Sequence, residues 1–217
     1  MPTVRSGWLR TTGLSVLNEP VIRAASTGIT RWEYEMQLPK SLFMACGLAL
    51  LSAVALANDM APIKPVAHVD LPRFMGKWYV IASIPSFIEK KAYNGVEAYQ
   101  LQPNGNVETS FRYRKNSFND PVKTIHSTGF VTPNTGNAVW GIQLIWPLKE
   151  QYLVAYLDDS YSETIVARDK RDYVWIMART PAIAQADYDA LVARVKQLGY
   201  KVSDIRKMPQ AWPETAQ

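Results

Sequence analysis

The stretch GKWYVIAS, residues 76–83, places together two residues that are unusual at the start of a β-strand. Gly76 is a poor strand former, and Trp78 is a large side chain that stabilises a fold only where it is buried. From Trp78 the inward face of a strand continues through Val80 and Ala82, because side chains alternate between two faces. The stretch therefore predicts a strand that starts at a crowded place, where Gly76 allows the backbone to pass closely and Trp78 packs beside it.

Short segments with alternating side chains recur after this strand. Residues 107–114 alternate in period two, and the preceding Pro103-Asn104-Gly105-Asn106 is a strong hairpin signal. About eight strands at this spacing, with turn residues between them, predict an antiparallel sandwich or a closed antiparallel barrel. The expected strands cover residues 76–83, 96–101, 107–114, 122–131, 138–145, 151–157, 163–167 and 173–179.

The pattern changes after Thr180-Pro181, because residues 182–198 place apolar side chains at helical spacing and Gly199 supplies a helix stop. An amphipathic helix that follows an all-β run must lay its apolar stripe on the outside of the sheet. Three shorter segments are also expected: a helical turn at residues 70–75, a final strand at 201–205 and a loose tail at 211–217.

Residues 36–57 have the pattern of a secretory signal peptide, with cleavage after Ala57. The apolar stretch 42–56 has about 15 residues, fewer than the roughly 20 that span a bilayer, which argues against the alternative of a transmembrane anchor. Cys46 lies near the start of this stretch instead of just behind it, which disfavours a lipobox. The pattern predicts an exported protein that is soluble rather than lipid-anchored.

The predicted organisation has four parts. Residues 1–35 are expected to be a leader outside the fold or a mis-assigned start, with Met36 as the natural start. The signal peptide of residues 36–57 follows, then an extended N-terminal arm of residues 58–69, and then one folded domain of residues 70–210.

Charge and cysteine content exclude several classes of function. The net charge of +5 is interspersed along the chain, and residues 58–217 carry 19 Lys and Arg against 16 Asp and Glu. This balance is too mild to indicate a nucleic-acid partner. Cys46 is the only cysteine, so the chain after Ala57 has neither a disulfide nor a thiol nucleophile.

The residues give almost no support for catalysis or a cofactor. His68 and His126 are the only histidines. His68 lies in the extended arm, and His126 has no second histidine or carboxylate at ligand spacing, whereas a metal site needs three or four ligands. Asp158 and Asp159 are neighbours that would point to opposite faces of a strand, which favours a role in a turn. No serine elbow or glycine-rich phosphate loop is present. We expect no catalytic residue, metal or cofactor.

With GKWYVIAS at its start and RDYVWIMARTP (171–181) at its end, the series of strands resembles the lipocalins, above all the bacterial outer-membrane lipocalins and their apolipoprotein D-like relatives. Three motifs occur in order: Gly76-x-Trp78, the turn around Asp158, and Arg179 at the end of the last strand. The resemblance covers roughly residues 68–210. It implies an all-β fold, an eight-stranded antiparallel up-and-down barrel with one C-terminal α-helix packed outside. It also implies that Arg179 stacks on Trp78 at the closed end of the barrel.

This chain departs from the family pattern at three places. The bacterial relatives are usually anchored through a cysteine at the mature N-terminus, and a convincing lipobox is absent here. The second motif, at residues 157–161, is degenerate. The cysteine on which prostaglandin-isomerising lipocalins depend has no counterpart in the barrel, which argues against an enzymatic member of the family.

A barrel of this size either fills itself with side chains or holds one small ligand. The resemblance implies a fatty acid or a lysophospholipid, in the storage, transport or repair of envelope lipids. It also implies that the exported protein lies in the periplasm or at the outer membrane. Tyr113, Tyr152 and Tyr156 are candidates to meet a carboxylate or phosphate head group at the rim, with Arg112 or Arg114 as weaker ones because they should face water. The candidate ligand-binding residues are Val80, Ala82, Phe111, Tyr113, Trp140, Ile142, Leu144, Tyr152, Val154, Tyr156, Trp175 and Met177.

Two alternatives stay open at this point. One is a lipid-modifying enzyme, and the other is an envelope interaction protein whose barrel is filled by its own core. The expected partners are a lipid ligand and a membrane, without nucleic acid, and either a monomer or a dimer is compatible with the sequence.

Overall fold

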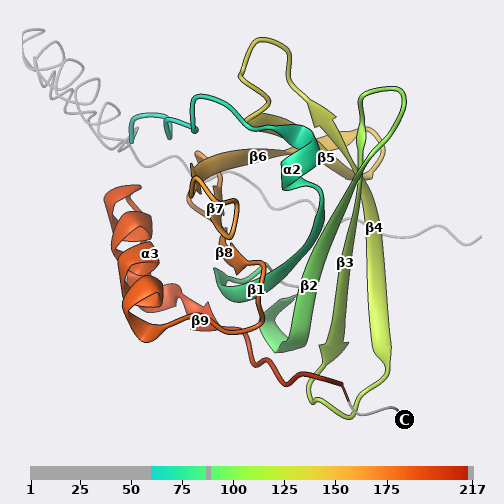
Figure 1. Cartoon of the computed structure of the whole chain (residues 1–217), viewed down its shortest axis with the longest axis vertical. Coiled ribbons are helices and arrows are strands. Elements are labelled where there is room, and N and C mark those ends of the chain that lie inside the picture. Colours follow the sequence, from blue (N-terminus) through green and yellow to red (C-terminus); the bar gives the residue numbers. More distant parts are fainter. Residues whose placement is uncertain (1–59, 87–88, 215–217) are drawn as a thin grey trace, which may run out of the picture. The chain divides into compact units, whose positions relative to one another are not determined.

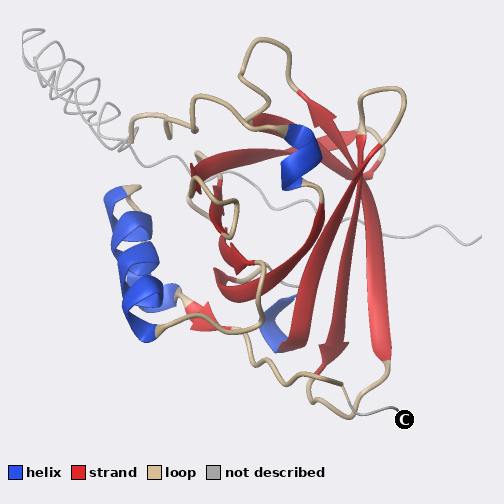
Figure 2. Cartoon of the chain, viewed as in Figure 1, coloured by secondary structure: helices blue, strands red, loops and turns tan. Residues whose placement is uncertain are grey.

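The computed structural model describes residues 60–86 and 89–214. The strands of this part form one antiparallel sheet in the order β2-β3-β4-β5-β6-β7-β8-β1-β9, and β1 also pairs with β2, which closes the sheet into a barrel (Figures 1 and 2). The elements are α2 (Leu71–Phe74), β1 (Gly76–Ile84), η1 (Glu89–Lys91), β2 (Ala92–Leu101), β3 (Val107–Lys115), β4 (Val122–Val131), β5 (Val139–Ile145), β6 (Leu148–Leu157), β7 (Glu163–Ala167), β8 (Val174–Ala178), α3 (Gln185–Gln197), η2 (Val202–Asp204) and β9 (Arg206–Lys207).

The predicted eight-stranded up-and-down barrel with an external C-terminal helix is confirmed. Strands β1 to β8 pair with their neighbours in chain order, and the two-residue β9 only extends the edge beside β1. Helix α3 buries Leu191 and Val195 in a cluster that also contains Ile165 and Ile176 from the barrel wall. In Figure 1 this orange helix lies outside the barrel, beside the orange strands β7 and β8.

Two predictions for the C-terminal region are wrong. Residues 202–204 form a 3-10 turn, and the final strand pairing moves to residues 206–207. Residues 211–214 are not loose, because Glu214 accepts hydrogen bonds from Arg112 and Arg114 on β3. These ion pairs lower the pKa of Glu214 to about 2. Both arginines are therefore engaged by the chain's own carboxylate and not by a ligand head group.

β-Bulges in two strands change which side chains face inward. In β1 the register with β8 shifts between Val80 and Ala82, and in β6 the register with β7 shifts between Val154 and Tyr156. Because side chains alternate in period two, one extra residue moves all that follow it to the opposite face. The predicted inward positions of Ala82 and Tyr156 are therefore wrong. Ala82 packs in the outer cluster, and Tyr156 lies beneath the guanidinium of Arg194 on α3.

The closed end of the barrel is built around Trp78. Its indole nitrogen donates to the carbonyl of Phe74 at 2.8 Å, which ties β1 to the short helix α2. The guanidinium carbon of Arg179 lies 3.8 Å from the centroid of the Trp78 ring, the cation–π contact that the motifs implied. Gly76 has a φ of +88°, and a Cβ placed there would meet only an ordinary contact. The left-handed backbone, and not the predicted close passage, explains this glycine.

The N-terminal arm and the second motif are also fixed by hydrogen bonds. Val66 and Val69 donate their backbone N–H groups to Val154 and Gly136, which holds the arm against the barrel. Asp158 accepts the backbone N–H of Glu163 at 2.6 Å, so this carboxylate closes the turn between β6 and β7. Helix α2 begins after Asp70, whose side chain accepts from Arg73 N.

The predicted leader of residues 1–35, the signal peptide of residues 36–57 and Cys46 lie outside the described residues. Within residues 60–86 and 89–214, the helices are all too short or too polar to cross a bilayer.

Candidate functional site

A cavity of about 230 Å³ lies inside the barrel, between the packed closed end and the open end. Its wall is mostly apolar and comes from strands β2 to β6, while Ser86, Glu89, Tyr173 and Trp175 border it at the open end. The lining residues are Ser86, Glu89, Glu97, Tyr99, Thr109, Phe111, Ile125, Ser127, Ile142, Leu144, Glu150, Gln151, Tyr152, Tyr173 and Trp175.

The structure divides the twelve predicted ligand-binding residues into three groups. Five line the cavity: Phe111, Ile142, Leu144, Tyr152 and Trp175. Five others belong to the inner core cluster without lining the cavity: Val80, Tyr113, Trp140, Val154 and Met177. The remaining two, Ala82 and Tyr156, lie outside the barrel for the reason given above. The barrel thus fills one part of its interior with side chains and leaves another part empty.

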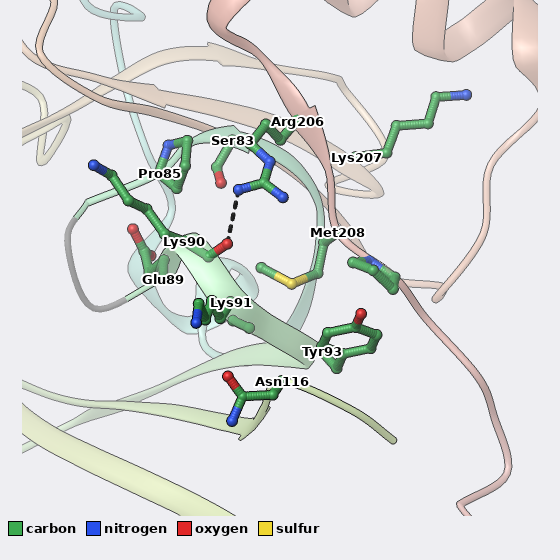
Figure 3. A pocket seen from close by; sticks show the side chains of 12 residues that line it. Ser83, Pro85, Glu89, Lys90, Lys91, Tyr93, Asn116, Arg206, Lys207 and Met208 are labelled. Carbon is green, nitrogen blue, oxygen red and sulfur yellow. Dashed lines mark hydrogen bonds between the residues drawn. The ribbon is translucent and has the colours of Figure 1, made fainter. Parts of the chain in front are cut away.

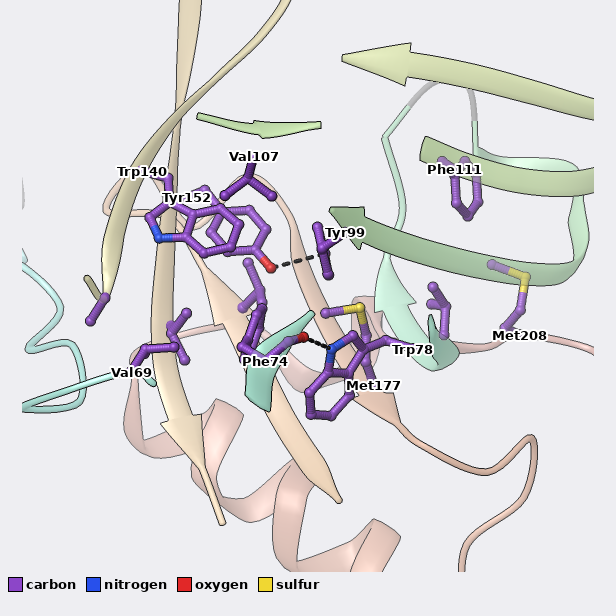
Figure 4. Packing of buried hydrophobic residues seen from close by; sticks show 14 of the residues in the cluster. Val69, Phe74, Trp78, Tyr99, Val107, Phe111, Trp140, Tyr152, Met177 and Met208 are labelled. Carbon is purple, nitrogen blue, oxygen red and sulfur yellow. Dashed lines mark hydrogen bonds between the residues drawn. The ribbon is translucent and has the colours of Figure 1, made fainter. Parts of the chain in front are cut away.

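Aromatic rings form the floor of the cavity (Figure 4). Trp140 stacks on Tyr152 with ring centroids 4.9 Å apart, and Phe74 from α2 meets the edge of Trp140 at 5.7 Å. The hydroxyl of Tyr152 donates to the hydroxyl of Tyr99 at 2.9 Å. Burial raises the pKa of both tyrosines, so both remain neutral at physiological pH. Of these rings only Tyr99 and Tyr152 line the cavity, so they and their hydroxyl pair are what the floor offers a ligand, while Trp140 and Phe74 support them from below.

Two acidic side chains contribute to the cavity wall. Glu89 is only 6% exposed and accepts hydrogen bonds from Trp175 Nε1 at 2.7 Å and from Ser86 N at 2.8 Å. The carboxyl group of Glu97 on β2 has no hydrogen-bond donor or counter-ion among the described residues. Burial, and secondarily the charge of Glu89, raise the pKa of Glu97 well above 4.5. A carboxyl group in this environment keeps its proton over a wider pH range than an exposed one.

The sequence reading missed Glu97, although one signal pointed to it. The hairpin at Pro103-Asn104-Gly105-Asn106 fixes the register of β2 and β3, and Glu97 pairs directly with Phe111. Directly opposed residues share a face of the sheet, so a Phe111 that points inward brings Glu97 with it. Tyr99 and Thr109 form another such pair in the same hairpin, and both line the cavity. A search for inward-facing apolar residues overlooks Glu97, because glutamate is charged.

Among the described residues, no lysine, arginine or histidine lines the cavity. Glu150 lies at its mouth and forms an ion pair with Arg168. Arg168 also pairs with Asp172 and lies over the ring of Tyr173, 4.3 Å from its centroid. The ionisable groups that line the cavity are therefore acidic or phenolic, and the cation beside Glu150 is already paired with two carboxylates.

A second hollow lies beside the mouth, between η1 and the segment around β9 (Figure 3). Its volume is about 330 Å³, and Lys90, Lys91, Arg206 and Lys207 give it a basic character. Arg206 donates to the carbonyl of Lys90 at 2.8 Å, which joins the two borders of this groove. Glu89 lines both hollows, so η1 separates an acidic cavity from a basic groove.

The hairpin between β5 and β6 exposes apolar side chains at the open end. Ile145, Trp146 and Leu148 are 66%, 81% and 65% exposed, and Leu144, which lines the cavity, is 48% exposed. The apolar surface thus continues from the cavity wall to the tip of this hairpin. We call residues 144–148 the apolar tip.

Within the described ranges, no three His, Cys, Asp or Glu side chains gather in an arrangement that would hold a metal ion. His126 is exposed on β4, away from the cavity lining.

Comparisons with known proteins agree with this architecture. Residues 69–210 match the family model of the lipocalin-like domain. The temperature-induced lipocalin-1 of Arabidopsis thaliana is 29% identical over 164 residues, which cover 71% of this chain and 86% of that protein. The outer membrane lipoprotein Blc of Escherichia coli K12 is 25% identical over 165 residues, covering 74% of this chain and 91% of that protein.

Among solved structures, the major allergen Per a 4 from cockroaches superimposes with a TM-score of 0.54 at 18% identity, covering 71% of this chain and 98% of that one. At this identity the likeness shows the fold alone. The family model covers well over half of the chain and includes the Gly76-x-Trp78 motif, Asp158 and Arg179. The chain therefore belongs to the lipocalin family.

Proposed function

We propose that this protein binds a lipid in its barrel and carries it, without catalysis, in a bacterial cell envelope. The observation that carries the proposal is the cavity of about 230 Å³, enclosed by the barrel and walled mostly by apolar side chains. Lipocalins bind small hydrophobic ligands and are in general not enzymes. Several relatives of this chain are named outer membrane lipoproteins, which supports the envelope location.

The volume of the cavity limits how much of a lipid it takes. An apolar cavity of about 150 Å³ is known to hold one benzene molecule, so this one takes roughly nine non-hydrogen atoms. Burial of about eight methylenes gives about 6 kcal/mol of binding free energy before ordering costs. This is less than the ten to twelve methylenes expected for a long acyl chain. A longer chain would leave the cavity through the mouth, along Leu144 and the apolar tip.

The apolar tip also supports an association with a membrane. Trp146 is 81% exposed, and an exposed tryptophan beside isoleucine and leucine is typical of a segment that enters the interfacial region of a bilayer. Leu144 belongs both to this tip and to the cavity lining. We propose that the tip touches the membrane while a lipid moves between bilayer and cavity.

The two alternative functions have less support. A lipid-modifying enzyme needs a nucleophile beside a base, and the described lining contains Ser86, Thr109 and Ser127 but no histidine. A purely structural role as an interaction protein would suit a barrel filled by its own core, whereas this barrel contains an empty volume.

Displacement of a polarity-sensitive fluorophore tests the proposed function. We expect wild-type protein to bind the fluorophore and to release it to medium-chain lipids at a stoichiometry near one to one. Ile125→Trp fills the cavity and should abolish binding, whereas Thr124→Trp, on the exposed face of the same strand, should leave it unchanged. The proposal fails if no lipid saturates the wild type, or if Ile125→Trp binds as well as Thr124→Trp.

A further inference from the structure

We propose that the cavity selects amphiphiles with a positively charged head group, such as an alkylammonium ion, and that Glu97 is the counter-ion. This inference rests on the proposed function, because it names the chemical class of ligand for the same cavity. It replaces the expectation of a carboxylate or phosphate head group inside the barrel.

The position of Glu97 is the first argument. It pairs with Phe111 in the β2–β3 register and lines the cavity above the hydroxyl pair of Tyr99 and Tyr152. Glu89 is held by Trp175 and Ser86, whereas the described residues offer the Glu97 carboxyl no donor. Glu97 is half-buried, so water still reaches its carboxyl group, but no described residue replaces the water that the cavity wall excludes. Polar groups withdrawn in part from water are normally satisfied by protein, water or ligand. A ligand that supplies an N–H donor and a positive charge satisfies this one.

The charges around Glu97 are the second argument. The titratable groups that line the cavity are three glutamates, Glu89, Glu97 and Glu150, and three tyrosines, Tyr99, Tyr152 and Tyr173. The described lining contains no basic residue that would neutralise an anionic head group. A carboxylate or phosphate inside the barrel would meet like charges in a medium that screens them poorly. A cation meets opposite charges and the faces of aromatic rings, which also attract it.

The depth of Glu97 sets the orientation of the ligand. Strand β2 runs from Ala92 at the open end to Leu101 at the closed end, so Glu97 lies near its middle. The head group therefore enters the barrel, and the alkyl tail extends past Ile142 and Leu144 towards the apolar tip. The basic groove on the other side of η1 does not take part in this binding mode.

Binding of a cation should be coupled to loss of a proton. In the free protein burial raises the pKa of Glu97, so this carboxyl group is protonated over a wider pH range than an exposed one. A cation beside it stabilises the ionised form, and the proton leaves to solvent. The affinity for an alkylammonium ion should therefore rise by up to tenfold per pH unit until the pH exceeds the pKa of free Glu97. Glu89, Glu150 and the three tyrosines are unchanged in Glu97→Gln. If the affinity of that variant no longer depends on pH, the released proton comes from Glu97.

A series of ligands with the same tail and different heads tests the proposal. Octylamine, octanol and octanoate have chains matched to the cavity, and they are titrated into the purified full chain by calorimetry at pH 7. We expect octylamine to bind at least tenfold more tightly than octanol and octanoate. Its binding enthalpy should depend on the ionisation enthalpy of the buffer, because a proton is released.

Variants make the assignment specific. Glu97→Gln should lower the affinity for octylamine at least tenfold and keep the affinity for octanol within about twofold of the wild-type value. It should also abolish the proton release. Glu108→Gln, an exposed glutamate on β3, should change none of these values. Thermal melts and the retained octanol affinity show that Glu97→Gln is folded.

Each remaining outcome overturns the inference in a distinguishable way. If octanol binds as tightly as octylamine, or if Glu97→Gln binds octylamine like the wild type, the cavity binds apolar chains but does not select a cation. The inference alone then fails. If octanoate binds most tightly, an anionic head group is the true ligand class. If none of the three binds, the proposed function fails as well.

Discussion

At the closed end of the barrel the charged group beside Trp78 has a full set of partners, whereas in the cavity above it the Glu97 carboxyl has no donor or counter-ion among the described residues. Arg179 donates hydrogen bonds to the carbonyls of Lys77 at 2.8 Å, Arg73 at 2.7 Å, Phe74 at 3.1 Å and Tyr161 at 3.2 Å, while its guanidinium covers the Trp78 ring. These contacts join α2, β1, the β6–β7 turn and the end of β8.

The two ends also differ in how apolar side chains are used. Trp78, Phe74 and Trp140 are almost fully buried at the closed end, whereas Ile145 and Trp146 at the open end are exposed to solvent. Buried, satisfied groups make the floor rigid, and unsatisfied or exposed groups leave the mouth ready to meet another molecule. This contrast predicts that stability and the proposed binding are separated along the barrel axis, and the following changes test that separation.

The largest expected effect distinguishes two residues of the same strand. Trp140→Ala removes a buried ring from the floor and should lower the free energy of unfolding by about 4 kcal/mol, or the melting temperature by about 8–16 °C. Leu144→Ala at the mouth should change the free energy of unfolding by about 0.5 kcal/mol or less, because this side chain is 48% exposed. Thermal and denaturant unfolding measure both. Equal losses would show that the mouth contributes to stability as much as the floor.

The next effect concerns the ring of partners around Arg179. Arg179→Ala removes the cation–π contact and leaves backbone carbonyls without their donor, so we expect a loss of about 3 kcal/mol, or about 6–12 °C in melting temperature. Arg179→Lys keeps the positive charge but lacks the planar guanidinium group, so it should lose less free energy of unfolding than Arg179→Ala but still be less stable than the wild type. Ligand affinity at the mouth should stay within about twofold for the variants that remain folded. An unchanged melting temperature in Arg179→Ala would contradict the role of this arginine.

A smaller effect, of opposite sign, is expected at Glu97 in the cavity. The folded-state pKa of Glu97 lies above its unfolded value, so stability falls as the pH rises from the unfolded pKa near 4.5 towards the folded pKa. Glu97→Gln removes this loss and should raise the melting temperature by a few degrees at pH 8, with little difference near pH 4. Melts across this pH range, with Glu108→Gln as the control, measure the effect. If Glu97→Gln instead melted at a lower temperature than the wild type at pH 8, the ionised Glu97 carboxylate would have a stabilising partner in the wild type.

The smallest effect on stability is expected at the apolar tip, where the effect on membrane binding should be clear. Trp146→Ser should change the free energy of unfolding by about 0.5 kcal/mol or less, because the side chain is exposed. The same variant should reduce co-sedimentation with phospholipid vesicles. Leu101→Ser, an exposed apolar residue of the β2–β3 hairpin, is the control and should bind vesicles like the wild type. Equal binding by Trp146→Ser and wild type would rule out the tip as the contact.

Much of the floor was predictable from the sequence, and less of the mouth. The spacing of Gly76, Trp78 and Arg179 identifies the family and implies the stacking that closes the barrel. The alternation on β3 and β5 correctly assigns Phe111 and Ile142 to the interior. These features are local or follow from motifs, because each depends on period-two alternation or on residue type.

The partition of the inward residues between core and cavity was not predictable in this way. Phe111 and Tyr113 stack on each other at 5.0 Å, yet only Phe111 lines the cavity. Tyr113 lies farther along β3 towards the open end than Phe111, so alternation alone does not tell which ring borders empty space, and that is a property of the assembled interior.

Strand alternation and turn residues act over a few neighbouring positions, so the sequence predicts about eight antiparallel strands followed by a helix. The family motifs, and not the alternation, favoured a barrel over a sandwich. The outward positions of Ala82 and Tyr156 depend on the assembled sheet, because a bulge is set by register with a neighbouring strand. The tertiary structure alone also placed Glu97 and Glu89 in one cavity. These two carboxyl groups come from β2 and from η1 at the mouth, and their coupling depends on the shared low-dielectric space that barrel closure creates.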